Sequence, residues 1–436
     1  MCPTASTNTL PGKAALLWDE SFLWGLMACK ALQDARLPFD LIRSEDIREG
    51  RLGEYRLLFV PGGWASNKIK ALGDGGVAAI RDFVHGGGRY LGFCGGAGLA
   101  TRDGIGLLPV RRKPTRERVP SFSGRVRLSL SGHPIWRNVA EPVFHAWWPS
   151  QFIAEDPGLQ VLAAYGEALP DAFSSDVNVG DTEQFGSWAE LEALYQINLD
   201  PRRMHDDPVV VEGAFGEGRV ILSLIHFDTP DDERGTAVLR SLWEYLLGAP
   251  GAHAEAGSAH GHPAPECIGQ EEAAARKAQA DRLGSLVRDL EASVDGLISL
   301  GMRNFLWFRR NALLFQWRRG VRGLEYCTLF MMTKEIAELV RRGSHTWDID
   351  ESACITDRAE KVKGILLPFV GKAERLLVLE RHALQSGHIT YEKCDDSIIK
   401  EMRGELFSTS KSHGGMFKEL IDAIDALLFS LLKSCG

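Results

Sequence analysis

The segment from Arg56 to Ala100 constrains the fold more than any other part of this chain, because it holds two short apolar runs that each stop at a pair of glycines. The first run ends at Pro61-Gly62-Gly63, and the second ends at Cys94-Gly95-Gly96. With Gly92 included, the second site has the G-x-C-x-G form of a nucleophile elbow, in which cysteine takes the place of serine. Such a turn is strained, and neighbouring residues with a β-carbon would collide with the adjacent strand and helix. The sequence therefore predicts a strand, a sharp turn that carries Cys94, and a helix.

Strand-like and helix-like segments alternate through the first hundred residues. The expected strands are apolar without alternation, which is typical of parallel strands buried on both faces. The strands are expected at Lys13–Trp18, Phe39–Ile42, Arg56–Val60 and Tyr90–Phe93, and the helices at Phe22–Ala35 and Gly75–Val84. The predicted fold is α/β, a mostly parallel, doubly wound, flavodoxin-like sheet. In such sheets ligands bind beyond the carboxyl ends of the strands.

The hydrophobic pattern changes between Val110 and Ile153. Here Arg125–Leu130 alternates polar and apolar residues, which indicates an insertion of antiparallel strands. A strand pair is expected at Pro208–Phe215 and Gly218–Leu224, followed by a helix from about Glu233 to Leu247. Leu159–Tyr165 is a candidate for a return to the main sheet, and Trp188–Tyr195 is a candidate helix.

The chain divides by composition into two domains. Residues 1–12 are expected to be disordered, 13–248 form the α/β domain, and 249–266, rich in Ala, Gly, Pro and His, form a flexible linker. Residues 267–436 are expected to form a bundle of five or six helices. The apolar stripes at 283–298 and 417–432 belong to it. Further helices are expected near 302–319, 324–342, 358–381, with a kink or break at Pro368, and 391–408.

Charge and cysteine content exclude several classes of function. The net charge of −8 gives no electrostatic reason to expect nucleic acid as a partner, and no apolar run approaches the roughly 20 residues that span a bilayer. Eight cysteines without a C-x-x-C pair suit reduced thiols in a cytoplasmic protein. The His and Cys residues of 253–267 lack the spacing of a tetrahedral site, so neither metal nor cofactor is expected.

A thiol attacks as its thiolate and needs a base at neutral pH. The candidate base is His226, with Asp228 as the carboxylate that orients it, since the two side chains of an extended H-x-D segment share a face. Backbone N–H groups at Gly62, Gly63 and Gly95 are candidates for an oxyanion hole. The alternative for Cys94 is a small buried hydrophobe, and for His226 a structural histidine that caps the strand.

Other candidate site residues carry weaker signals. Asp19 and Glu20 follow the first strand, where a carboxylic acid could tune the thiol, although a solvated loop acid is the simpler interpretation. Trp147, with His145 and Trp148, could wall a pocket or belong to the core. Met302–Gly323 carries six arginines and no acid among aromatic residues, which fits a central helix with snorkelling arginines better than a nucleic-acid or membrane surface.

Taken together, Phe59–Gly63, Gly86–Ala97, Gly218–Ser223 and His226–Asp228 resemble a class I glutamine amidotransferase-like domain of the biotin-protein-ligase N-terminal-like branch, over residues 13–248. The resemblance implies Cys94 as nucleophile, His226 as base and Asp228 as its acid. Asp228 stands where the family usually has glutamate, and Gly98 where the branch often carries an aromatic residue. Nothing after residue 250 resembles an ammonia-consuming synthase or a biotin ligase.

Two functions follow as expectations. The first is a cysteine-dependent hydrolase or amidase that acts on a C–N bond of a small-molecule or amide substrate through a thioester. The second is a catalytically weak ligand-sensing or assembly module whose helical bundle binds a protein partner or a second copy, motivated by the stripes at 283–298 and 417–432.

Overall fold

The computed structural model describes residues 13–248, 270–343, 347, 349–386, 394–409 and 412–434. The chain divides into two compact units, Met1–Glu255 and Ala256–Gly436. The predicted disordered segment 1–12 and the predicted linker 249–266 lie outside the described residues.

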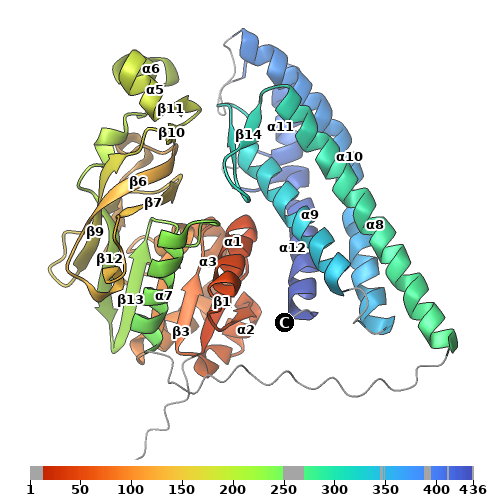
Figure 1. Ribbon diagram of the computed structural model, residues 1–436, viewed down its shortest axis with the longest axis horizontal. Coiled ribbons are helices and arrows are strands. Elements are labelled where there is room, and N and C mark those ends of the chain that lie inside the picture. Colours follow the sequence, from red (N-terminus) through yellow and green to blue (C-terminus); the bar gives the residue numbers. More distant parts are fainter. Residues whose placement is uncertain are drawn as a thin grey trace, which may run out of the picture. The chain divides into compact units, whose positions relative to one another are not determined.

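The first unit is built on an 11-stranded sheet with a parallel core (Figure 1). The order across this core is β2, β1, β3, β4 and β13, and each neighbouring pair is parallel. These strands are Phe39–Ile42, Ala14–Leu17, Leu57–Val60, Arg89–Phe93 and Gly218–Ser223. Every residue of β1 and β3 is buried, as strands covered on both faces require. The predicted fold class is confirmed.

The sheet continues beyond β13 with antiparallel strands. β12 pairs with β13 and β9, β9 with β6, and β6 with β7 and β10, which pairs with β11. Their bounds are Pro208–Phe215 (β12), Gln160–Ala168 (β9), Phe122–Leu130 (β6), Val143–Trp147 (β7), Phe173–Ser174 (β10) and Val177–Asn178 (β11). A separate small pair joins β5 (Arg111–Arg112) to β8 (Phe152–Ile153). The antiparallel insertion and the return strand predicted from the sequence are both present.

The helices of this unit follow the strands as expected, with one longer than its periodicity indicated. α3 runs over Ala65–His85, whereas only its second half was predicted, because Gly73 (φ 60°, ψ 178°) interrupts the helical geometry in the middle. The others are α1 (Phe22–Asp34), α2 (Ser44–Arg48), α4 (Gly95–Ala100), α5 (Val179–Phe185), α6 (Trp188–Tyr195) and α7 (Glu233–Leu247).

The second unit is helical, and its two longest helices pack side by side (Figure 1). The helices in its described residues are α8 (Gln270–Arg303), α9 (Gly323–Gly343), α10 (Ile349–Gln385), α11 (Ser397–Phe407) and α12 (Gly415–Ser434). α10 continues through Pro368, so of the kink or break predicted there, the break does not occur. The apolar residues that define the two predicted stripes are buried in the core of this unit, apart from the half-buried Leu432 near the end of α12.

One prediction for this unit is wrong: residues 302–319 do not form a helix. β14 (Trp307–Arg309) and β15 (Phe315–Trp317) form an antiparallel hairpin instead. The Asn311 side chain closes its turn by accepting hydrogen bonds from the Leu313 and Leu314 N–H groups, at 2.9 and 2.8 Å. An apolar pattern that runs all the way round a helical wheel does not separate a buried helix from a short hairpin, and turn chemistry decided the outcome here.

A buried ion pair joins two helices of the second unit. Arg403 Nε on α11 donates to Glu380 Oε1 on α10 at 2.7 Å, and Arg403 also donates to the Gly320 carbonyl. Glu380 is 1% exposed, and burial raises its pKa even though Arg403 opposes the shift. Without Arg403, a carboxylate would be left in the core with no cationic partner in contact.

We expect Arg403→Met to lower the unfolding free energy by about 3–5 kcal/mol, because breaking a buried pair costs more than replacing it. The double variant Arg403→Met/Glu380→Met should recover most of that loss. Urea denaturation of the full chain, with hydrogen exchange to localise the change to α10 and α11, measures both. The exposed Arg342, which pairs with Glu338, is the control: Arg342→Met should stay within about 0.5 kcal/mol. A double variant as unstable as the single one would contradict this account.

In the first unit, the glycines after Cys94 allow two backbone segments to touch. A β-carbon on Gly96 would lie 1.9 Å from the Val60 carbonyl oxygen, while one on Gly98 would meet only the end of the Arg112 side chain, at 3.1 Å. Gly96→Ala should therefore destabilise the protein by about 1–3 kcal/mol or more, since backbone atoms must move. Gly98→Ala, in the same helix, should be neutral or slightly stabilising. Thermal unfolding monitored by circular dichroism tests both, and equal effects would be inconsistent with the proposed backbone contact.

Candidate active site

Cys94 occupies a sharp turn between β4 and α4. Its backbone angles are φ 48° and ψ −103°, a region that side-chain-bearing residues rarely adopt and that costs on the order of 1–3 kcal/mol. The Cys94 N–H donates to the Ser223 carbonyl at 2.8 Å, and the Cys94 carbonyl accepts from the Gly98 N–H at 2.9 Å. The turn is therefore anchored on one side to β13 and on the other to its own helix.

The glycines around Cys94 are required by close backbone contacts. A β-carbon on Gly95 would lie 1.9 Å from the Gly63 carbonyl oxygen, and one on Gly92 would lie 2.7 Å from Gly96. Gly63 itself has φ 115°, and a β-carbon there would approach the Glu20 carbonyl oxygen to 2.4 Å. The loops that follow β1, β3 and β4 thus meet at one edge of the sheet.

His226 and Asp228 follow β13, the strand next to β4. His226 Nδ1 and Asp228 Oδ1 are 2.9 Å apart, and both side chains are fully buried. A neutral or charged ring with its proton on Nδ1 donates this bond, so Asp228 fixes the ring with Nε2 available for another partner. The shorter acid at position 228 reaches the imidazole.

Cys94 also acts on the imidazole. His226 Nε2 is buried and makes no hydrogen bond in the described residues, while the Cys94 sulfur favours the protonated ring electrostatically. Burial disfavours the charged imidazolium, but the Asp228 carboxylate and the Cys94 sulfur outweigh it and raise the pKa of His226 to about 10. At neutral pH, His226 is therefore the cationic member of a site that also holds a thiol and a carboxylate.

Trp24 covers His226, which the sequence patterns did not predict. The two ring centroids are 4.8 Å apart with an interplanar angle of 31°. Gly62 makes this placement possible, since a β-carbon there would lie 2.8 Å from Trp24 Cγ. Trp24 is 8% exposed and shields the imidazole from water. The signal that could have identified it is a tryptophan two residues into a helix that begins at the carboxyl end of β1.

The predicted pocket residue Trp147 is buried and holds the loop of His226. Trp147 Nε1 donates to Thr229 Oγ1 at 3.0 Å, and its ring stacks on His145 with centroids 5.3 Å apart. The His226 N–H donates to the His145 carbonyl at 2.9 Å, and His145 Nδ1 lies 2.9 Å from Asp232 Oδ2. Trp147 is only 2% exposed, so in this structure it packs in the core beside the histidine.

Asp19 and Glu20 differ in their surroundings. Both Asp19 carboxylate oxygens accept hydrogen bonds, from Arg43 Nη1 at 2.7 Å and the Ser44 N–H at 2.5 Å, which ties the loop after β1 to α2. Glu20 adopts φ 54°, packs its carbonyl against Gly63 and accepts from Asn67 Nδ2 at 3.1 Å. The Asp19 carboxylate thus holds the loop after β1 in place, whereas the Glu20 backbone packs against Gly63.

The candidate oxyanion donors lie at the same sheet edge. Gly62 and Gly63 belong to the loop after β3, and their N–H groups donate to no acceptor in the described part of the chain. Gly95 is the first residue of α4, and the first N–H groups of a helix have no partner within it. The N–H groups of Gly62, Gly63 and Gly95 therefore lie near Cys94 and make no hydrogen bond in the described residues.

The structure also brings two arginines and a tyrosine near the elbow that the sequence patterns did not single out. Arg112 lies over Gly98, while Arg118 and Tyr165 interact electrostatically with Cys94. Arg112 ends β5, Arg118 follows a short helical turn over Thr115–Glu117, and Tyr165 lies in β9, which is far from Cys94 in sequence. Only the pairing of the antiparallel strands places them there.

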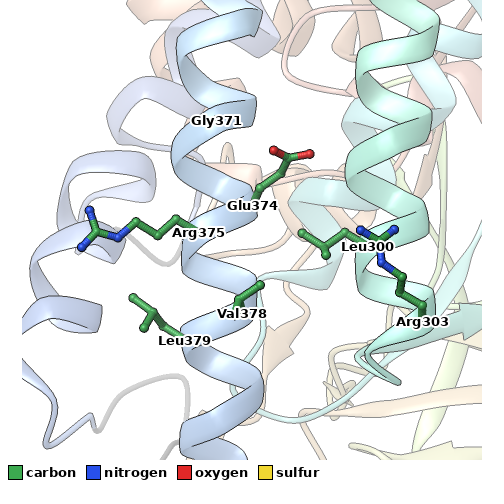
Figure 2. A pocket seen from close by; sticks show the side chains of 7 residues that line it. All are labelled: Leu300, Arg303, Gly371, Glu374, Arg375, Val378 and Leu379. Atoms are coloured by element: carbon green, nitrogen blue, oxygen red, sulfur yellow. The ribbon is translucent and has the colours of Figure 1, made fainter.

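Outside this site we looked for metal-binding groups, membrane-spanning helices and surface pockets in the described residues. They contain no group of three or more His, Cys, Asp or Glu able to hold a metal, and none of their helices has both the length and the apolar character that a membrane span requires. A surface hollow in the second unit lies between α8 and α10 (Figure 2). Leu300 and Glu374 point into the space between the two helices, whereas Arg375 points to the opposite side of α10.

One protein family matches the part of the sequence that contains Cys94. A sequence model of the family described as "Biotin-protein ligase, N terminal" matches residues 49–103. This segment contains β3, α3, β4 and α4, and with them Cys94 and all three candidate oxyanion donors. It does not reach His226 or Asp228. No curated protein matches the sequence.

Several solved structures resemble the first unit. PurLQS from Thermotoga maritima is 16% identical, with 54% of this chain and 100% of that chain covered and a TM-score of 0.37. A GMP synthase component from Thermoplasma acidophilum is 11% identical (54% and 94% covered, TM-score 0.36). A ThuA-like protein from Bacteroides uniformis is 12% identical (58% and 97% covered, TM-score 0.35). At these values no statement about activity follows from the likenesses. The resemblance to the biotin-protein-ligase N-terminal family, noted from the sequence, is confirmed for the segment that carries the elbow.

The raised pKa of His226 predicts how stability depends on pH. The folded protein binds a proton that the unfolded chain releases near pH 6.5, so this contribution is complete below pH 6.5 and is lost as pH rises toward about 10. Within that window the unfolding free energy should fall by up to about 1.4 kcal/mol per pH unit. Urea denaturation at several pH values should show this slope in the wild type and a much smaller one in His226→Gln. Equal slopes would show that the pKa of His226 is not raised.

Proposed function

We propose that this chain is a cysteine-dependent hydrolase or amidase that cleaves a C–N bond through a thioester on Cys94. The observation that carries the proposal is the fully buried His226–Asp228 pair, at 2.9 Å, beside a cysteine held at φ 48° on a nucleophile elbow. Burial of two charged groups is costly unless they interact with one another or with a third group, and here the third group is the thiol. If His226 were only a hydrogen-bonded core residue, the strained backbone turn at Cys94 would serve no purpose.

The chemistry follows from the three side chains. The Cys94 thiolate attacks the amide carbon, and the oxyanion that forms accepts hydrogen bonds from N–H groups of Gly62, Gly63 and Gly95. The His226 imidazolium donates its Nε2 proton to the leaving nitrogen, so an amine or ammonia departs and a thioester remains. His226, now neutral, removes a proton from water, which attacks the thioester and releases a carboxylic acid. The Cys94 sulfur leaves as the thiolate and His226 keeps the proton, which restores the starting pair.

Each neighbour has a supporting part in this proposal. Asp228 orients the imidazole and stabilises its positive charge, and the 2.9 Å bond supports aspartate as a sufficient replacement for the glutamate of related proteins. Trp24 limits the access of water to the ring. Glu20 contacts Gly63 through its backbone carbonyl, while its carboxylate accepts a hydrogen bond from Asn67, so it supports the glycine loop in this proposal.

The alternative, a sensing or assembly module, loses its sequence motivation. The stripes at 283–298 and 417–432 that suggested an uncovered binding face lie almost entirely in the core of the second unit. The hydrolase is therefore the function that the described residues support better, and we do not pursue the module further.

Alkylation by iodoacetamide at pH 7 tests the activated nucleophile. We expect Cys94 to react about tenfold faster than the exposed Cys354, because an unassisted cysteine is only a few per cent thiolate at this pH. His226→Gln and Asp228→Asn should slow Cys94 toward the rate of Cys354, while Asp228→Glu should retain part of the rate. Mass spectrometry of tryptic peptides measures each site separately.

The exposed His205 provides a matched control, since His205→Gln removes a histidine of the same unit without touching the site. A second readout is the acyl adduct formed on Cys94 by an activated ester, which Cys94→Ser should abolish. Equal alkylation rates for Cys94 and Cys354, or rates insensitive to His226→Gln, would exclude this mechanism.

A further inference from the structure

A cluster of positive charge lies beside the elbow. The guanidinium of Arg112 sits over α4, where a β-carbon on Gly98 would be 3.1 Å from its Nη1. Gly98 is four residues after Cys94, so the absence of a side chain there leaves room for the arginine. Arg118, six residues further along the chain, interacts electrostatically with the Cys94 sulfur and with Arg112.

Two buried polar atoms in this cluster have no partner in the described residues. Tyr165 is fully buried, and its hydroxyl makes no hydrogen bond. Arg118 Nε is likewise buried without an acceptor, while its Nη1 donates only a long bond, 3.4 Å, to the Pro149 carbonyl. Tyr165 interacts with both Arg118 and Cys94, so the two orphaned donors belong to the same site. Burying a donor without a partner is unfavourable, and a bound acceptor would relieve that cost.

The charges around the cluster do not cancel. Asp207 is the carboxylate nearby, and Lys113 Nζ already contacts both of its oxygens at 2.7 Å, while Gln151 Nε2 also donates to it. Neither Arg112 nor Arg118 makes an ion pair with a carboxylate in the described residues. Burial and the neighbouring Arg112 lower the pKa of Arg118, and Cys94 and Tyr165 oppose this shift only in part.

We infer that Arg118, Tyr165 and Arg112 form a subsite for an anionic group of the substrate, a carboxylate or a phosphate, next to the carbon that Cys94 attacks. The planar fork of an arginine binds either group through two parallel hydrogen bonds, and a tyrosine hydroxyl adds a third. This inference rests on the proposed function, since it assigns the class of amide that the site accepts. Neutral amides would leave the two buried donors unpaired and would be poor substrates.

Two alkylating reagents that differ mainly in charge test the subsite. Iodoacetate carries a carboxylate, and iodoacetamide is its neutral amide. We expect the ratio of the iodoacetate rate to the iodoacetamide rate to be about tenfold higher at Cys94 than at the exposed Cys354 of the same protein. Arg118→Met should remove most of that preference, Arg118→Lys should retain part of it, and Tyr165→Phe should lower it two- to threefold.

Arg116→Met is the matched control, because Arg116 lies close to Arg118 in the chain and its side chain is 85% exposed. Its ratio should equal that of the wild type, and circular dichroism verifies that each variant folds. Protection of Cys94 from iodoacetamide by acetate identifies a carboxylate subsite, and protection by inorganic phosphate identifies a phosphate subsite.

The outcomes separate the two proposals. If Cys94 reacts no faster than Cys354 with iodoacetamide, the activated nucleophile fails. If Cys94 reacts fast but its preference for iodoacetate is the same in the wild type and in Arg118→Met, the anion subsite is refuted and the hydrolase stands. Protection by neither acetate nor phosphate also counts against the subsite.

Discussion

The close contact between two glycine turns holds the candidate site together. Gly95 and Gly96, after β4, press against the backbone of Gly63 and Val60, after β3, at distances where no β-carbon fits. This contact aligns the carboxyl ends of neighbouring parallel strands, so that a thiol and free backbone N–H groups share one edge of the sheet. It also places Gly62 beneath Trp24, which in turn covers His226. The geometry of the thiol, the donors and the histidine thus depends on the same few glycines.

The second determinant is electrostatic. His226, Asp228 and Cys94 bring together groups of opposite charge in a place that excludes water, and the imidazolium is stable there only because both neighbours are present. Arg118 and Tyr165 extend the same region with donors that have no acceptor of their own. Buried charges and unpaired donors lower the stability of the folded protein. A bound ligand that pairs with these groups would offset that loss.

Local patterns predicted a large part of the structure. Continuous apolar strands stopped by glycine identified the parallel core, and the G-x-C-x-G turn identified Cys94. The H-x-D spacing identified His226 and Asp228. The helix predicted at 302–319 was wrong because aromatic and apolar residues on every face have no periodicity that separates a helix from a hairpin, and the Asn311 turn decided it. For Trp147 the sequence left a pocket wall and a core position open. The structure buries it, and Trp24 is the aromatic side chain that covers the histidine.

The sequence by itself determined most of the elements and the sharp turn that carries Cys94, since glycine positions, apolar runs and a two-residue spacing act over short distances along the chain. Only the tertiary structure decided what surrounds Cys94. The pairing of β13 with β4 sets His226 beside Cys94. The antiparallel pairing of β9 with β6, and of β5 with β8, brings Tyr165, Arg112 and Arg118 to the same edge. These neighbours are separated in sequence by up to 132 positions, counted from Cys94 to His226. Strand order in the folded sheet brings them together, and no local pattern encodes it.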